Sequence, residues 1–427
     1  MSRMILPSIA CISLTAASFS LVGCPLRPAL EGEALPAEEA LQPQHPWVFQ
    51  TGQRYSPVQV QQTSDGGYVV AETTDGRFAG GKQMCLVKMD GDGSMLWSKT
   101  FGGAQDDFAY AMQQTSDAGY ILAGESVSLE GAVGGTAMYV AKSDESGNLM
   151  WSKTFAGNRQ GSAAAVRQTS DRGYLVAGSA QRLPTASEFL REYGREYVYL
   201  IKTDASGEPV WSRTIEVGWY DYVKSVLETS DGEYAVAGWS LDFPIAISSY
   251  AWVLKIGSDG HEIWLRKYKT SDLTEEMLVG LLPAADAGYF AASEISYLGP
   301  FEVMAVPVGY WLRLRKIDAT GDLLWERTYN ADTSSGVTEI CPAVDGGFLL
   351  VGNEIIVGAK IWVSKSDENG QVLWVKSFGS EGSDLTATAA QSAGDGGYVI
   401  AGQMTSRDSP GITDMYVLRI DANGDPL

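Results

Sequence analysis

Residues 97–124, WSKTFGGAQDDFAYAMQQTSDAGYILAG, contain the pattern that the rest of the chain repeats. The stretch opens with Trp97, passes a Gly-Gly pair, and ends with Asp117, Tyr120 and a short apolar run. Its most regular feature is an Asp followed three residues later by an aromatic residue. This feature occurs about every 50 to 60 residues, at Asp65, Asp117, Asp171, Asp231, Asp286, Asp345 and Asp395. A period of this length indicates a solenoid, a propeller or another repeat array.

Each repeat predicts four short β-strands. A half-apolar strand precedes the Asp, and a nearly continuous apolar run follows it, as in residues 68–71 and 174–178. Such runs are typical of strands that are buried on both faces. A third strand ends in a cation, and a fourth opens with Trp, as in residues 97–101. Seven such repeats with Gly-rich turns predict an all-β fold, a seven-bladed β-propeller with four antiparallel strands per blade.

The spacing also predicts how the ring closes. Seven residues separate the end of the third strand from the Trp of the fourth strand, as from Asp90 to Trp97. In the last repeat the third strand ends at Asp421, so its Trp would follow Leu427. We expect residues 47–50, which begin with Trp47, to supply this outer strand instead. The propeller would then span residues 46–427 and leave only short, protected strand edges.

Residues 1–23 are typical of a secretory signal peptide, because Arg3 precedes an apolar run that reaches Val22. The run ends in Leu-Val-Gly-Cys24, which resembles the lipobox of bacterial lipoproteins. The resemblance implies that Cys24 carries a diacyl anchor such as palmitate and becomes the new N-terminus. A secretory signal with a chance Cys and an uncleaved membrane helix are the alternatives. Residues 25–45 are rich in Pro, Glu, Ala and Gln, so we expect residues 24–45 to form a lipidated Cys and a flexible tether.

The repeats resemble the bacterial seven-bladed β-propeller repeat, whose pattern is W-x-K-x-F-G-G…D…D-G-G-Y-x-V-A-G. Residues 97–124 match this pattern almost throughout, and the resemblance covers residues 47–427. The Asp-x-x-Gly-x-x-x-Trp hairpins also resemble the tryptophan-docking repeats of quinoprotein propellers. No set of residues matches a quinone site, so the resemblance implies no cofactor. It implies the fold and assigns no activity, because propellers have many functions.

Charge and composition exclude several functions. The chain has 52 acidic and 31 basic residues and a net charge of −21, whereas nucleic-acid binding needs clustered Lys and Arg. Its only two histidines, His45 and His261, exclude a multi-histidine metal centre and lie outside any catalytic-triad context. We expect no metal site. Cys85 and Cys341 lie in blades that are not neighbours, so we expect two buried thiols without a disulfide.

We expect the residues that recur in every repeat to have structural roles. The Asp residues at the turns suit tight-turn geometry, although Asp90 and Asp92 also resemble part of a calcium loop. The cations of the third strand suit cross-strand pairing with nearby acids. These cations are Lys88, Lys142, Lys202, Lys255, Lys316, Lys365 and Arg419.

The insertions that break the repeat are the places where we expect function. Blades three to five carry longer loops at residues 179–197, 239–250 and 293–311, and the connection 216–222 enters on the same face. Long loops on a rigid scaffold concentrate binding residues, and aromatic side chains beside acids suit sugars or protein partners. The alternative is that the loops pack on one another and cover the ring. The predicted ligand-binding residues are Phe189, Tyr193, Trp219, Tyr220, Tyr222, Trp239, Phe243, Tyr297, Phe301 and Tyr310.

These observations predict a monomeric, lipid-anchored, extracytoplasmic propeller of the bacterial cell envelope. It would bind a glycan or another envelope protein through the loop face of blades three to five. One alternative is a scaffold subunit of an envelope assembly complex. Another is a polysaccharide lyase or glycosidase, which needs a positioned pair of carboxylates. Asp221, Asp242, Glu188 and Glu294 lie near the loops, but their spacing selects no pair, so no catalytic residue is assigned.

Overall fold

The computed structural model describes most of the chain after residue 32. The described residues are 33–34, 39–41, 47–49, 56–74, 80–127, 135–155, 159–182, 195–242, 248–269, 274–298, 307–331, 335–354, 359–379, 382–408 and 413–427. The chain divides into two compact units, Met1–Glu31 and Gly32–Leu427, and the first lies outside the described residues, as does Cys24. In the described part of the chain, no helix has the length and hydropathy that a membrane crossing requires.

The described strands form six hydrogen-bonded sheets. The first contains β4 (Ser56–Gln62), β5 (Tyr68–Thr73), β6 (Met84–Met89) and β7 (Met95–Phe101), and the second contains β8 (Asp107–Gln114), β9 (Tyr120–Ser126), β10 (Ala137–Ser143) and β11 (Leu149–Phe155). An eight-stranded sheet contains β12 (Arg159–Gln168), β13 (Tyr174–Arg182), β14 (Glu196–Thr203), β15 (Pro209–Ile215), β16 (Tyr220–Glu228), β17 (Tyr234–Asp242), β18 (Ser248–Ile256) and β19 (Glu262–Tyr268).

The remaining sheets continue the same order. One contains β20 (Thr274–Pro283), β21 (Tyr289–Leu298), β22 (Pro307–Ile317) and β23 (Leu323–Ala331), with β1 (Glu33–Ala34) at its edge. The next contains β24 (Ser335–Pro342), β25 (Phe348–Glu354), β26 (Ile361–Ser366) and β27 (Val372–Phe378), with β2 (Glu39–Leu41) at its edge. The last contains β28 (Ser383–Ser392), β29 (Tyr398–Ser406), β30 (Thr413–Ile420) and β3 (Trp47–Phe49).

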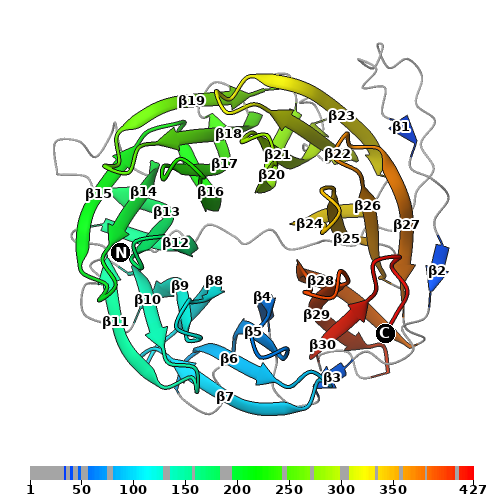
Figure 1. Ribbon diagram of the computed structural model, residues 1–427, viewed down its shortest axis with the longest axis horizontal. Coiled ribbons are helices and arrows are strands. Elements are labelled where there is room, and N and C mark those ends of the chain that lie inside the picture. Colours follow the sequence, from blue (N-terminus) through cyan, green and yellow to red (C-terminus); the bar gives the residue numbers. More distant parts are fainter. Residues whose placement is uncertain are drawn as a thin grey trace, which may run out of the picture. The chain divides into compact units, whose positions relative to one another are not determined.

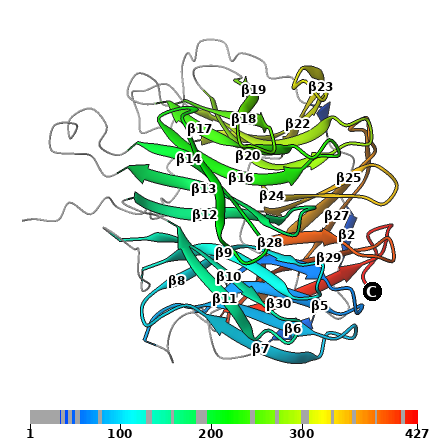
Figure 2. The same cartoon turned by 60° about the vertical axis from the view of Figure 1, so that its left-hand side comes forward.

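Within the unit Gly32–Leu427 the sheets surround a common centre, with the first strand of each repeat innermost and the fourth outermost (Figures 1 and 2). Each repeat is an antiparallel meander, and the eight-stranded sheet consists of two such meanders, β12–β15 and β16–β19. A single residue pair, Glu196 with Tyr220, joins these two. The prediction of an all-β propeller built from four-stranded antiparallel units is confirmed.

An ion pair fixes the turn between the first two strands of each repeat. Asp65 accepts hydrogen bonds from Thr63 Oγ1 at 2.5 Å and from the Gly67 backbone N–H at 3.0 Å. The buried Lys88 ammonium lies 2.9 Å from the second oxygen of the exposed Asp65 carboxylate. Partial burial alone would raise the pKa of Asp65, but these hydrogen bonds outweigh it and lower the pKa to about 2. The same pair recurs as Asp117–Lys142, Asp171–Lys202, Asp231–Lys255, Asp286–Lys316, Asp345–Lys365 and Asp395–Arg419.

These pairs confirm the structural role predicted for the recurring Asp residues and cations. A buried cation without a partner would be strongly destabilising, so the turn carboxylate is what allows a Lys or Arg in each third strand. Cys85 and Cys341 are also buried and unpaired, as expected.

The Trp that opens an outer strand packs on a turn of the following repeat. A Cβ atom added to Gly147, whose φ is +75°, would lie 2.7 Å from a ring carbon of Trp97. Only Gly provides both the positive φ and the close approach at this turn. The same contact joins Trp151 to Gly207, Trp211 to Gly260, Trp264 to Gly321, Trp325 to Gly370 and Trp374 to Gly424.

Glutamine side chains join neighbouring inner strands, including those of the last and first sheets. The Gln62 N–H donates to Gln391 Oε1 at 3.1 Å, and the Gly394 N–H donates to Gln62 Oε1 at 2.6 Å. Val60 and Tyr68 of the first sheet share a hydrophobic core with residues of β28, β29 and β30. The first and last sheets therefore pack directly on each other.

The strand β3 pairs with β30, the third strand of the last repeat, as expected for the segment around Trp47. Its register differs from that of the other outer strands: Trp47 lies opposite Val417, whereas Trp97 lies opposite Lys88, the equivalent of Arg419. In the first sheet the outer strand ends in the buried Phe101, which lies opposite Met84, the first residue of the third strand. Phe49 takes the corresponding place opposite Met415, so the observed register favours burial of this Phe position. The side chain of Trp47 lies outside the described residues.

Two short stretches of the expected tether also form strands. Residues 33–34 pair in parallel with β23, and residues 39–41 pair in parallel with β27 (Figure 1). The low content of large apolar side chains led us to expect no structure here. Pairing with an open outer strand uses backbone N–H and C=O groups, so it does not require an apolar sequence.

Candidate functional site

The predicted ligand-binding residues are only partly within the described structure. The side chains of Trp219, Tyr220, Tyr222, Trp239 and Tyr310 are described, and all five are partly buried. Four predicted residues, Phe189, Tyr193, Phe243 and Phe301, lie outside the described residues, and of Tyr297 only the backbone in β21 is described. The choice between an exposed binding surface and loops that cover the ring therefore stays a prediction for those residues.

Four of the described aromatic residues, Trp219, Tyr220, Tyr222 and Trp239, lie where β16 begins and β17 ends. Tyr222 and Trp239 are cross-strand partners, and their rings stack with centroids 4.2 Å apart. The Arg195 guanidinium lies 4.3 Å above the ring of Trp219 and forms an ion pair with Glu216 at 2.5 Å. By contrast, Tyr310 belongs to β22 in a different sheet.

A pocket of about 210 Å³ lies beside Tyr222. Its walls come from the end of β9, the start of β12, the end of β13 and the start of β14 and β16. Apart from Tyr222 the lining is polar and consists of Glu125, Thr136, Gln160, Gly161, Ser162, Ser179, Gln181 and Glu196. Hydroxyl, amide and carboxyl groups from three successive repeats thus converge next to an aromatic ring.

Both carboxyl groups of the pocket hold their protons more tightly than usual. Burial raises the pKa of Glu125 although Tyr110 donates a hydrogen bond to it. Burial and the negative charge of Asp221 raise the pKa of Glu196. Burial, with the nearby charge of Glu196, raises the pKa of Tyr222 to about 12. Carboxyl groups with raised pKa values in a polar pocket can both donate and accept protons or hydrogen bonds.

Sequence reasoning missed most of this pocket. Glu196 lies inside the inserted segment 179–197, so the insertion could have singled it out. The same holds for Gln181, whereas Glu125 and Gln160 carry no such signal, because they stand on ordinary strands outside the insertions.

Asp221, one of the carboxylates considered for catalysis, has a structural role. It is fully buried, and its two oxygens accept hydrogen bonds from Val217 N–H at 3.0 Å, Gly218 N–H at 2.7 Å and Ser240 Oγ at 2.6 Å. Burial raises the pKa of Asp221 even against these hydrogen bonds. The carboxylate thus organises the connection that leads into β16.

Of the other three candidate carboxylates, only Glu294 has a described side chain. Glu294 accepts a hydrogen bond from the Val337 N–H at 3.2 Å, which joins two sheets. Glu188 and the side chain of Asp242 lie outside the described residues.

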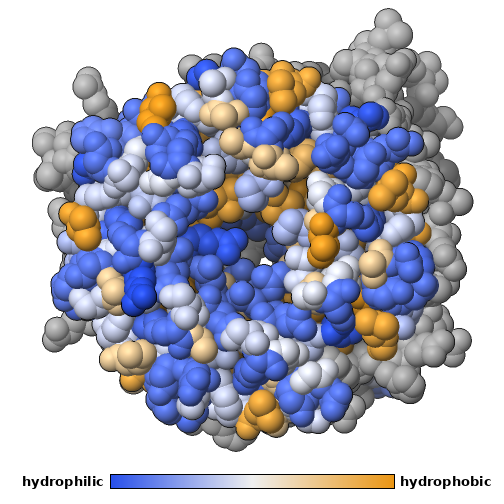
Figure 3. Space-filling model, viewed as in Figure 1, coloured by the Kyte–Doolittle hydropathy of each residue, from blue (hydrophilic) through white to orange (hydrophobic). Residues whose placement is uncertain are grey.

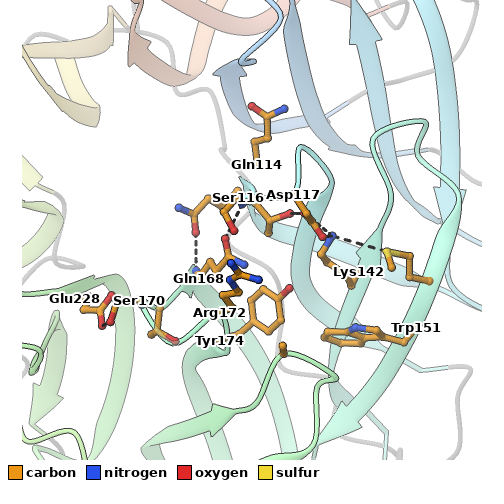
Figure 4. A pocket seen from close by; sticks show the side chains of 15 residues that line it. Gln114, Ser116, Asp117, Lys142, Trp151, Gln168, Ser170, Arg172, Tyr174 and Glu228 are labelled. Atoms are coloured by element: carbon orange, nitrogen blue, oxygen red, sulfur yellow. Dashed lines mark hydrogen bonds and ion pairs between the residues drawn. The ribbon is translucent and has the colours of Figure 1, made fainter.

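A larger hollow of about 960 Å³ lies at the turns between β8–β9 and β12–β13 (Figure 4). Its polar groups are already paired with one another: Lys142 with Asp117, Ser116 N–H with Gln168, and Ser170 with Glu228. Two of its lining residues depart from the repeat: Glu228 replaces the Gln of the preceding repeats, and Arg172 has φ +67° where four of the equivalent turns have Gly. Residues that recur in the repeats form nearly all of this hollow. We therefore regard it as the gap that remains where the turns of two neighbouring sheets diverge, and not as a specific site.

The described residues contain no group of three or more His, Cys, Asp or Glu side chains that could hold a metal ion. The two histidines contribute little to any described site, because His45 lies outside the described residues and His261 is an exposed turn residue beside Asp259.

No protein-family model matches the chain, and no curated protein matches it. Among solved structures, it is similar to puromycin hydrolase, with a TM-score of 0.55 and 13% identity over 91% of this chain and 56% of that one. A puromycin-hydrolyzing peptidase of Mycobacterium tuberculosis gives a TM-score of 0.52 and 12% identity over 92% of this chain and 56% of that one. The chain thus spans little more than half the length of these two proteins. At this level of identity the similarity shows the fold alone, a β-propeller.

We predict that Asp221→Ala destabilises the protein by about 2–3 kcal/mol, because two buried N–H groups and the Ser240 hydroxyl lose their acceptor. Urea unfolding measures the change. Glu216→Ala is the matched control: it removes an acid of the same connection that is exposed and paired only at the surface, so stability should change by less than about 1 kcal/mol. Equal stability of the two variants would contradict the structural role of Asp221.

Proposed function

We propose that this protein is a carbohydrate-binding β-propeller that takes the end of a glycan into the pocket beside Tyr222. The observation that carries the proposal is the combination of a stacked aromatic pair, Tyr222 with Trp239, and a small pocket lined by amide, hydroxyl and carboxyl groups. Sugars present apolar C–H faces to aromatic rings and paired hydroxyl groups to such polar side chains.

The charges around the pocket favour a neutral or amino sugar over an acidic one. Glu125 and Glu196 line the pocket, and none of the described residues that line it is a Lys or an Arg. The net charge of −21 adds a repulsive field for anionic polymers. A carboxyl group with a raised pKa is well suited to a sugar hydroxyl, since it can donate as well as accept a hydrogen bond.

The same two carboxyl groups support a second candidate, a polysaccharide-active enzyme. Glycoside hydrolysis uses one protonated and one ionised carboxyl group on either side of the scissile bond. Glu125 and Glu196 stand in one pocket, and both have raised pKa values. Release of sugar products, abolished by Glu125→Gln, would distinguish this candidate from binding alone.

We also infer that the propeller has seven blades and that β3 completes the last one. Seven Asp–cation pairs recur along the chain, and only the pair Glu196–Tyr220 joins the meanders β12–β15 and β16–β19 into one sheet. The antiparallel pairing of β3 with β30 supports closure by residues 47–49, as do the hydrogen bonds of Gln62 to the last sheet.

We further propose that the protein is a lipoprotein of the bacterial cell envelope and acts outside the cytoplasm. The support is the signal-like segment 1–23 and the lipobox that ends at Cys24. A surface or periplasmic location is where an anchored binding protein would encounter envelope glycans.

We predict that Tyr222→Ala and Glu196→Gln each weaken binding of a neutral oligosaccharide about tenfold or more. A glycan array selects the oligosaccharide, isothermal titration calorimetry measures its affinity, and circular dichroism verifies folding. Tyr310→Ala is the matched control, because Tyr310 is a partly buried aromatic residue that does not line the pocket. Absence of glycan binding, or full binding by Tyr222→Ala, would refute the proposal.

For closure, we predict different effects of two deletions. Removing residues 25–44 deletes β1 and β2 and should lower the melting temperature little. Removing residues 25–50 also deletes β3, which leaves β30 with an open edge, and should lower the melting temperature by several degrees more. Identical melting curves for the two proteins would contradict closure by β3.

For the anchor, we predict that Cys24→Ala moves the protein from the membrane fraction to the soluble fraction after cell lysis. Loss of the acyl chains removes the apolar contact with the bilayer. Unchanged partitioning of the variant would show that Cys24 does not anchor the protein.

A further inference from the structure

The inner strands share one irregularity. Each inner strand has a β-bulge, a register shift at the same point of its pairing with the second strand, as between Pro57 and Gln59 in β4. The extra residue at each shift lines one cavity of about 190 Å³ at the centre of the sheets, where Figure 3 shows a hollow bordered largely by hydrophilic residues. These residues are Val58, Tyr110, Ala164, Lys224, Val279, Thr338 and Thr388. The bulges therefore turn one side chain from every repeat toward the centre.

The lining of this central cavity contains three charged residues, Arg167, Lys224 and Glu339. Arg167 Nε donates to the Val226 carbonyl at 3.3 Å, and Glu339 Oε1 accepts from the Ile340 N–H at 3.2 Å. Within the described structure, the two terminal nitrogens of Arg167 and the Lys224 ammonium have no hydrogen-bond or ion-pair partner. Glu339 attracts both cations through space, but no ion pair within 4.0 Å joins it to either. Lys224 is an exposed residue, so its ammonium is open to solvent. With two cations and one carboxylate, the lining carries an excess positive charge in a strongly acidic protein.

Apolar side chains also border the cavity, although most of its exposed lining is polar. Val279, Leu281 and Ile340 line the cavity from β20 and β24. A monoanion with a short hydrocarbon part could contact the two cations and also these apolar side chains.

We propose that the central cavity binds a small carboxylate, with its anionic group between Arg167 and Lys224 and its apolar part against Val279, Leu281 and Ile340. The bound carboxylate supplies the acceptors that these two cations lack. The site is separate from the glycan pocket. Tyr110 connects the two, because its side chain lines the cavity and its hydroxyl donates to Glu125 of the pocket.

Glu339 makes this binding depend on pH. The groups that face it are Lys224 and Arg167, with the Cys341 thiol on its own strand. Burial raises the pKa of Glu339 to about 7, and the two cations only partly offset it. Between pH 8 and pH 6 Glu339 becomes neutral, so the charge of the cavity rises from +1 to +2 and carboxylate affinity should rise.

Calorimetric titration of the purified chain with butyrate, and with butanamide as its neutral analogue, tests the proposal. We expect butyrate to bind more tightly at pH 6 than at pH 8 and butanamide not to bind. Lys224→Met should weaken butyrate binding at least tenfold, whereas Arg172→Met, which removes an exposed cation at the turns, should leave it unchanged. Glu339→Gln should bind butyrate equally at both pH values.

A second variant keeps the test decisive if Lys224→Met does not fold. Ala164→Leu adds volume to the cavity without changing its charge and should also abolish butyrate binding. Equal binding of butyrate and butanamide, or normal butyrate binding by folded Lys224→Met or Ala164→Leu, would overturn the proposal. No butyrate binding by the unmodified chain would show that the three charges only brace the inner strands.

Discussion

The structure depends on the pairing of a turn aspartate with a buried cation of the third strand. In each repeat the ammonium or guanidinium group lies among apolar strands, where an unpaired charge is strongly unfavourable. The carboxylate that neutralises it also accepts backbone hydrogen bonds that hold the turn, as Asp65 does from Gly67. One interaction thereby fixes the turn between the first two strands and the position of the third. The outer-strand Trp then packs on the Gly turn of the next sheet and joins neighbouring repeats.

Features that can bind ligands occur where single repeats differ from this common plan. The repeated residues satisfy one another, which explains why the large hollow at the turns offers few free groups (Figure 4). The pocket beside Tyr222 combines residues that differ from one repeat to the next, and the central cavity has charges from only three of its strands. A repeat protein can thus keep a uniform framework and place specific chemistry at positions where the repeats vary.

The sequence predicted the all-β propeller, the strand order and the Asp–cation pairs, because all of these follow from a period that many residues share. It predicted that the segment around Trp47 pairs with the third strand of the last repeat, but the repeat spacing did not specify the register of that pairing. It did not predict the pocket, because Glu125, Gln181 and Tyr222 lie in three repeats and converge only in space. Of the aromatic residues singled out in the insertions, Tyr222 lines the pocket and Trp239 stacks on it. The side chains of Phe189, Tyr193, Phe243, Tyr297 and Phe301 lie outside the described residues.

Hydrogen–deuterium exchange of the protein with and without a bound neutral oligosaccharide tests the central claim most directly. If the glycan site is where the repeats diverge beside Tyr222, protection should be confined to residues 160–162, 179–181, 196 and 220–222. Protection of the turn segments 114–117 and 168–174 instead would place the ligand in the hollow formed by the common framework. That result would contradict the account.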